Sequence, residues 1–163
     1  MIFRYARHMA VAGALVASVA ASARAQSTTQ TISFAINAIN QIAFAGAPSL
    51  TVSTAIAGAP PSSVTNSTAT WAVTTNQTGA KITASIPAIM PAGLTMSSSL
   101  AAPAGATSAG FMPLGTVAVD LVTGITKIAQ SALVVTYKLD ATAAAGVVSS
   151  AARIVTYTIT GGT

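Results

Sequence analysis

The sequence has no cysteine and few charged residues, with seven Lys and Arg against two Asp and Glu. No disulfide can hold the fold, so stability must come from packed apolar surface. Glutamate is absent, and the single histidine is His8, close to the N-terminus. Acid-base catalysis, nucleophile activation and zinc binding depend on groups that titrate or ligate near neutral pH. We therefore expect no enzyme, no metal site and no cofactor.

Much of the positive charge lies in a segment that resembles a secretory leader. Two arginines and an apolar run are followed there by the small-residue motif Ala23-Arg24-Ala25, a pattern typical of a cleaved signal peptide. We expect a signal over residues 1–25 and a mature chain, 26–163, that is secreted, either extracellular or at the cell surface. Without the leader the net charge falls from +5 to +2. Four scattered cations cannot form the basic patch that nucleic-acid binding needs.

The dominant period of the mature chain is two residues, as expected for half-buried β-strands. Thr, Val and Ile alternate with small or polar residues, and Gly, Pro, Asn and Ser clusters separate the runs. We expect an all-β fold, an antiparallel immunoglobulin-like two-sheet sandwich of about eight strands in one domain. No run in the mature chain approaches the roughly 20 apolar residues of a membrane span. The expected strands are 32–44, 49–56, 68–75, 80–86, 94–100, 114–122 ending before Gly124, 132–141 and 152–160.

Several side chains have expected structural places. Trp71, the only tryptophan, is predicted to lie in the core rather than on a sugar-binding surface. The last strand is predicted to send three alternate side chains into the core, namely Val155, Tyr157 and Ile159. The two carboxylates, Asp120 and Asp140, are expected to pair with Lys138 or Arg153 at the surface.

The segment 30–45 is the most distinctive feature of the sequence. Apolar side chains stand at alternate positions over residues 32–44, a run that would extend about 40 Å at roughly 3.3 Å per residue. Such a strand could pair within its own subunit, could be donated to a neighbouring copy, or could be divided between both uses, because each demands the same alternation. If the strand is donated, the knobs are Ile32, Phe34, Ile36, Ile42 and Phe44.

The leader, the early strand ISFAINAINQIAF, the Thr/Ser/Ala-rich body and the final strand RIVTYTIT together resemble the secreted fimbrial, pilin-like subunits of bacteria, including spore-coat-U-like proteins. The resemblance covers the whole mature chain. It implies a β-sandwich that assembles by donor-strand exchange, with a periplasmic chaperone and an outer-membrane assembly protein as transient partners.

From these features we expect a non-catalytic structural subunit of an extracellular surface filament, similar to a pilus or fimbria. Its partners would be copies of itself in a homopolymer held by β-strand complementation. The alternative is a monomeric secreted β-sandwich that acts as an adhesin or carbohydrate-binding module. A binding module would need an exposed aromatic platform or convergent polar loops, of which the sequence offers little.

Overall fold

The computed structural model describes residues 24–163. The expected leader therefore lies outside the described residues, apart from its last two positions. Chain contacts divide the protein into two units, residues 1–35 and 36–163. In the first unit, the described residues form no helix or strand. Within residues 24–163, all strands and the single 3-10 turn lie in the second unit.

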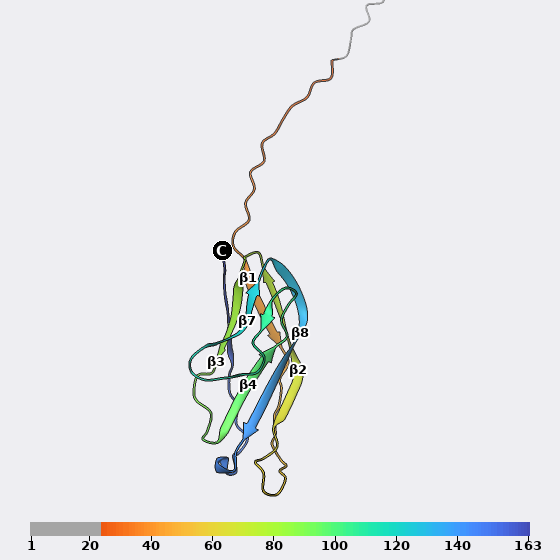
Figure 1. Cartoon of the computed structure of the whole chain (residues 1–163). Coiled ribbons are helices and arrows are strands. Elements are labelled where there is room, and N and C mark those ends of the chain that lie inside the picture. The colour runs from red at the N-terminus through yellow and green to blue at the C-terminus, as the bar shows by residue number, and fades with distance from the viewer. Residues whose placement is uncertain (1–23) are drawn as a thin grey trace, which may run out of the picture. The chain divides into compact units, whose positions relative to one another are not determined.

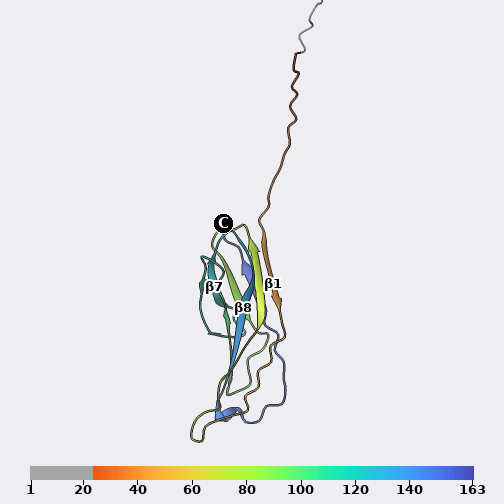
Figure 2. The same ribbon diagram turned by 90° about the vertical axis from the view of Figure 1, so that its right-hand side faces the viewer.

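The second unit is an antiparallel two-sheet sandwich, so the expected fold class is confirmed, with nine strands instead of about eight. The five-stranded sheet has the order β1-β2-β8-β4-β6 and the four-stranded sheet has the order β5-β7-β3-β9. Figure 1 shows the strands of the sandwich, and Figure 2 shows it turned by 90°, with β7 and β1 on opposite sides. The first sheet contains β1 (Asn40–Ala45), β2 (Val64–Thr75), β8 (Ile128–Ala141), β4 (Leu94–Leu100) and β6 (Met112–Pro113). The second contains β5 (Thr107–Ser108), β7 (Val119–Ile125), β3 (Ala80–Ser85) and β9 (Thr156–Thr160).

The core lies between the sheets and is built from the inward positions of the alternating strands. The expected place of Trp71 is confirmed, because its side chain is 1% exposed and its indole nitrogen donates to the carbonyl oxygen of Ala101 at 3.2 Å. Burying an aromatic of this size with its polar group satisfied is strongly stabilising. Other large side chains that are fully enclosed are Ile82, Ile86, Leu100, Leu121, Ile125, Val122 and Val135.

The structure corrects several strand predictions. The strand expected over 32–44 begins only at Asn40, and the strand expected over 152–160 begins only at Thr156. Residues 49–56 form no strand and contribute only an isolated bridge between Ala55 and Pro61. This segment lies in a long loop that contains Gly and three Pro, which favour turns over ladder pairing. The strand expected over 114–122 begins only at Val119 and continues through Gly124, because β7 carries a bulge there and Gly124 adopts a φ of +77°.

The strand directions define two ends of the sandwich. The turn end carries the tight β2–β3 and β7–β8 connections, and the amide of Lys127 in one turn donates to the carbonyl of Gln77 in the other at 2.9 Å. The loop end carries the long connections 46–63, 86–93 and 142–155, the last with a single 3-10 turn (Ala143–Ala145). Because β1 runs from the turn end to the loop end, the chain enters the sandwich at the turn end.

Candidate functional site

The first half of the alternating segment is not part of any strand. No secondary structure is formed from residue 24 to Ile39. Three of the predicted knobs lie here and are almost fully exposed, with exposed fractions of 77% for Ile32, 93% for Phe34 and 81% for Ile36. Contiguous exposed apolar side chains of this size are uncommon on a soluble protein and mark interaction surfaces. We call residues 24–35 the N-terminal arm.

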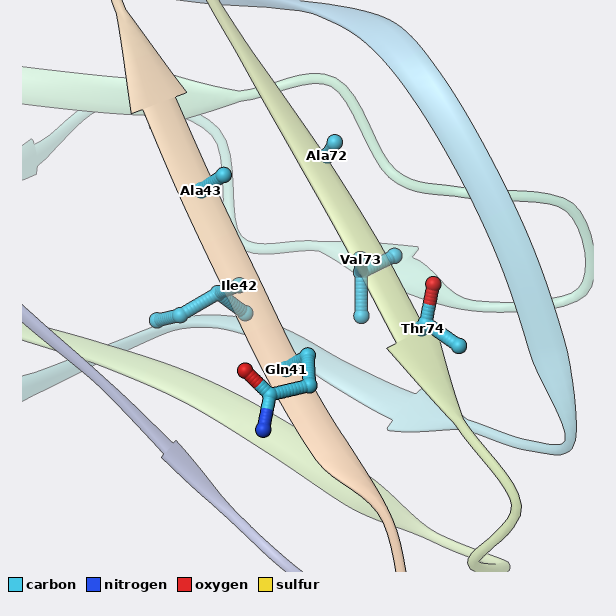
Figure 3. A pocket seen from close by; sticks show the side chains of 6 residues that line it. All are labelled: Gln41, Ile42, Ala43, Ala72, Val73 and Thr74. Carbon is cyan, nitrogen blue, oxygen red and sulfur yellow. The ribbon is translucent and has the colours of Figure 1, made fainter.

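The second half of the segment pairs within the subunit. Strand β1 lies antiparallel to β2, with Ile42 opposite Val73 and Phe44 opposite Trp71. These two predicted knobs are half-buried and pack against the core of their own chain. Figure 3 shows the paired strands at Ile42 and Val73, where they line a shallow hollow of about 160 Å³. The structure therefore places the five predicted knobs in two groups, three in or beside the arm and two in β1.

Strand β9 is the outermost strand of its sheet and pairs only with β3. The three residues predicted as the core of the last strand pack against the core but remain half-buried: Val155, Tyr157 and Ile159. Their neighbours, the threonines of β9, point outward and are exposed. One row of main-chain donors and acceptors on β9 thus has no strand beside it within the described residues.

Strands β1 and β9 lie on the same side of the sandwich, one in each sheet. The rings of Phe44 and Tyr157 are stacked, with centroids 3.9 Å apart and planes 12° from parallel. Five apolar side chains therefore line a partly covered seam between the two edge strands, which we call the β1/β9 seam: Ile42, Phe44, Val155, Tyr157 and Ile159.

A hydroxyl network holds the middle of this seam. The Tyr157 hydroxyl lies 2.7 Å from that of Tyr137 on β8 and 3.3 Å from the hydroxyl of the fully buried Ser98 on β4. Burial raises the pKa of Tyr157 far above its usual value, and the hydrogen bond with Ser98 opposes part of this rise. Tyr157 therefore stays neutral and links the two sheets across the core, away from the solvent rim.

The two sides of the sandwich differ in how their edges are protected. On the far side, β5 and β6 are two residues long, and β6 ends in Pro113. Short strands and proline are common ways to prevent edge-to-edge pairing. Neither β1 nor β9 contains a proline, a lysine or another charged residue. The β1/β9 side thus combines two unprotected edges with half-buried apolar side chains, whereas the half-buried Met112 on the far side lies on a short strand that ends in proline. An added β-strand could pair with either unprotected edge.

Both carboxylates of the described residues form ion pairs at the surface. Asp140 pairs with Lys138 at 2.9 Å and accepts a hydrogen bond from Ser63, which lowers the pKa of the carboxyl group. Asp120 pairs with Lys81 at 3.0 Å, not with Lys138 or Arg153 as expected. Among residues 24–163, no group of His, Cys, Asp or Glu side chains could hold a metal ion. None of these residues forms a helix that is long and apolar enough to span a membrane.

Comparison with known proteins identified no match for this chain. No protein-family model matches the chain, and neither a curated protein nor a solved structure matches it. The geometry of the β1/β9 seam and the N-terminal arm is therefore the basis for a functional assignment.

Proposed function

We propose that the protein is a non-catalytic structural subunit of an extracellular filament, in which the N-terminal arm of one copy fills the β1/β9 seam of the next. A single observation carries the proposal. The chain presents an unpaired alternating apolar segment together with an unprotected strand edge whose apolar row is incompletely covered. Main-chain hydrogen bonds would supply affinity, and the alternate side chains would supply register.

The arm is long enough for this role. The arm from residue 26 onward, together with the adjoining Ile36, can span about 35 Å at roughly 3.3 Å per residue, which exceeds the length of β9. Because the knobs repeat every two residues, as do the half-buried positions of β9, one face of the arm can follow the seam throughout. Alternate positions on the other face, such as Ser33 and Ala35, would point to solvent.

The alternative function, a monomeric carbohydrate-binding module, has less support. Sugar binding on a β-sandwich would need an exposed aromatic platform, and Trp71 is enclosed in the core. Phe111 is exposed, but the ammonium group of Lys138 lies 5.6 Å from the centre of its ring. This contact occupies one face of the ring, which a stacked sugar would otherwise use.

The first test is negative-stain microscopy of the mature protein, combined with electrophoresis of boiled and unboiled samples. We expect regular filaments and a ladder that collapses to the monomer on boiling. The decisive variants are Phe34→Asp and its matched control Ser33→Asp, which place the same charge on opposite faces of the arm. Phe34→Asp should abolish assembly, because a carboxylate would enter an apolar seam. Ser33→Asp should assemble normally.

A cysteine pair tests the acceptor directly, because the natural chain has no cysteine to interfere. Ser33→Cys combined with Thr158→Cys on β9 should give disulfide-linked multimers under oxidation. The control pair, Ser33→Cys with Thr74→Cys, uses an exposed threonine on β2, which already has a strand on both sides. A uniform particle of one subunit mass, with no cross-linked multimers, would overturn the proposed function.

A further inference from the structure

The segment that joins the N-terminal arm to β1 is held by one asparagine. Asn76, just past the end of β2, donates its main-chain N–H to the carbonyl oxygen of Ile39 at 3.2 Å. Its side-chain oxygen accepts the N–H of Ile39 at 2.8 Å, and its side-chain nitrogen donates to the carbonyl oxygen of Asn37 at 2.8 Å. The Gln77 side chain donates to the same Asn76 oxygen at 2.8 Å and helps to fix the amide.

These bonds continue the β1–β2 ladder beyond the end of β2. The regular register ends with Asn40 opposite Thr75. The main chain of Asn76 adds one bond to Ile39, and its side chain takes the place of further strand residues by bonding both Ile39 and Asn37. The chain is thereby kept in line with β1 for several residues after its neighbouring strand has ended.

The joining segment also borders an open hollow, in which Ile36 remains 81% exposed. The side chains of Ile36 and Ile39 line a hollow of about 570 Å³ together with residues from the end of β2 and the start of β8, including Thr74 and Ile128. No strand of the second sheet contributes to this hollow. The joining segment is thus held on the sheet of β1 and not on the sheet that contains β9.

An arm that paired with its own subunit would have to reverse at this segment. The free edges of β1 and β9 both run back toward the loop end, so the chain would need a tight turn between Ile36 and Ile39. A two-residue reversal takes its central residues out of ladder pairing, which would break the bonds from Asn76. A reversal nearer the N-terminus would place Phe34 or Ile32 in the turn itself. Too few knobs would then remain to cover the seam.

We propose that Asn76 is a latch that prevents the arm from capping its own subunit and so keeps it available to a second copy. This inference rests on the proposed function, because it explains why the arm pairs with a second copy and not with its own subunit. Asn76 is a positioning residue. It acts through the main chain of residues 37–39 and has no contact with the seam.

The test compares Asn76→Ala with Asn66→Ala. Asn66 lies on β2 and, like Asn76, bonds a neighbouring segment through its side chain, donating to the carbonyl oxygen of Ser49 at 3.0 Å, but it lies toward the loop end. Amide hydrogen exchange of residues 27–35 is measured in the monomer fraction of each variant. Loss of two hydrogen bonds worth about 1 kcal/mol each should shift the equilibrium toward self-capping by on the order of tenfold or more.

We expect arm amides that are unprotected in the monomers of the natural protein and Asn66→Ala, but protected in Asn76→Ala, together with a larger monomer fraction. Trp71 fluorescence verifies that each body is folded, and Asn76→Asp, which keeps the oxygen acceptor but loses the donor, should be intermediate. Unprotected arm amides in a folded Asn76→Ala monomer would overturn the latch. Failure of the natural protein to polymerise would instead overturn the proposed function, so the two results are distinguishable.

Discussion

The two halves of the segment 32–44 have the same sequence pattern and different structures. In the first half, Phe34 is 93% exposed and lies in no strand, whereas Phe44 in the second half stacks on Tyr157 and lies opposite Trp71. The difference comes from the neighbouring strand β2 and not from the segment itself. Strand β2 ends at Thr75, and the last main-chain hydrogen bond to the segment comes from Asn76. Alternation gives a strand the capacity to pair, while the length of its neighbour decides where pairing stops.

The largest expected effect is the difference in the free energy of unfolding between two deletion variants. Removing residues 26–36 should leave the free energy of unfolding of the body unchanged, because these residues form no ladder. Removing residues 26–45 also takes away β1, exposes one edge of β2 and uncovers Trp71, at a cost of about 5 kcal/mol or more, comparable with the whole stability of a typical domain. Urea denaturation followed by Trp71 fluorescence measures both. Similar midpoints for the two truncated proteins would contradict the division of the segment at Asn40.

A pair of single substitutions sharpens the same comparison. Phe44→Ala should lower the free energy of unfolding of the monomer by about 2 to 3 kcal/mol, below the value for a fully buried ring because Phe44 is half-buried. Phe34→Ala should change it by less than about 0.5 kcal/mol, as for other exposed positions. Thermal or urea unfolding of non-assembling preparations provides the measurement. An equal loss in both variants would mean that the arm folds onto its own body.

The hydroxyl network gives a smaller, pH-dependent effect. Tyr157→Phe should cost about 1 kcal/mol near neutral pH, because Ser98 is buried and loses a partner. The pKa of Tyr157 is raised in the folded state, so its contribution is complete below the ordinary tyrosine pKa near 10 and stability falls as pH rises above that value. The natural protein should therefore lose stability between pH 9 and 11 more steeply than Tyr157→Phe. Parallel slopes would show that Tyr157 does not titrate differently on folding.

The smallest effect is expected at the loop end, away from both halves. The Asp140 carboxyl group accepts from Ser63 and pairs with Lys138, and these contacts lower its pKa. Its contribution is present above the ordinary Asp pKa near 4 and disappears as pH falls through the lower folded value. Asp140→Asn should therefore flatten the acid limb of the stability curve slightly, measured by thermal unfolding from pH 2 to 6. A large effect at neutral pH would indicate that this surface pair contributes more than such pairs normally do.

Local patterns predicted much of the fold. The alternation around Trp71 and over Leu94–Leu100 identified real strands, because half-buried strands must alternate. The same reasoning failed at 49–56, where alternate apolar residues occur in a loop whose only β-pairing is an isolated bridge. Pattern alone could not distinguish these cases, since pairing depends on whether a partner strand is within reach.

The candidate site was only partly visible in the sequence. Spacing correctly predicted that Val155, Tyr157 and Ile159 face the core, while the five knobs remain a prediction for the filament. The sequence did not indicate the role of Asn76, because asparagine is common in turns that contain glycine. Its bonds to Asn37 and Ile39 join positions more than 35 residues apart in the sequence.

The sequence by itself determined that the protein is an all-β sandwich, because its period of two residues and scarcity of charge suit half-buried strands. It also determined that an apolar strand lies near the N-terminus. Only the tertiary structure decided that β1 and β9 form two open edges on one side, and that pairing stops at Asn76. Those facts depend on which strands end up beside each other, and the number and length of a strand's neighbours are not encoded in its own residues.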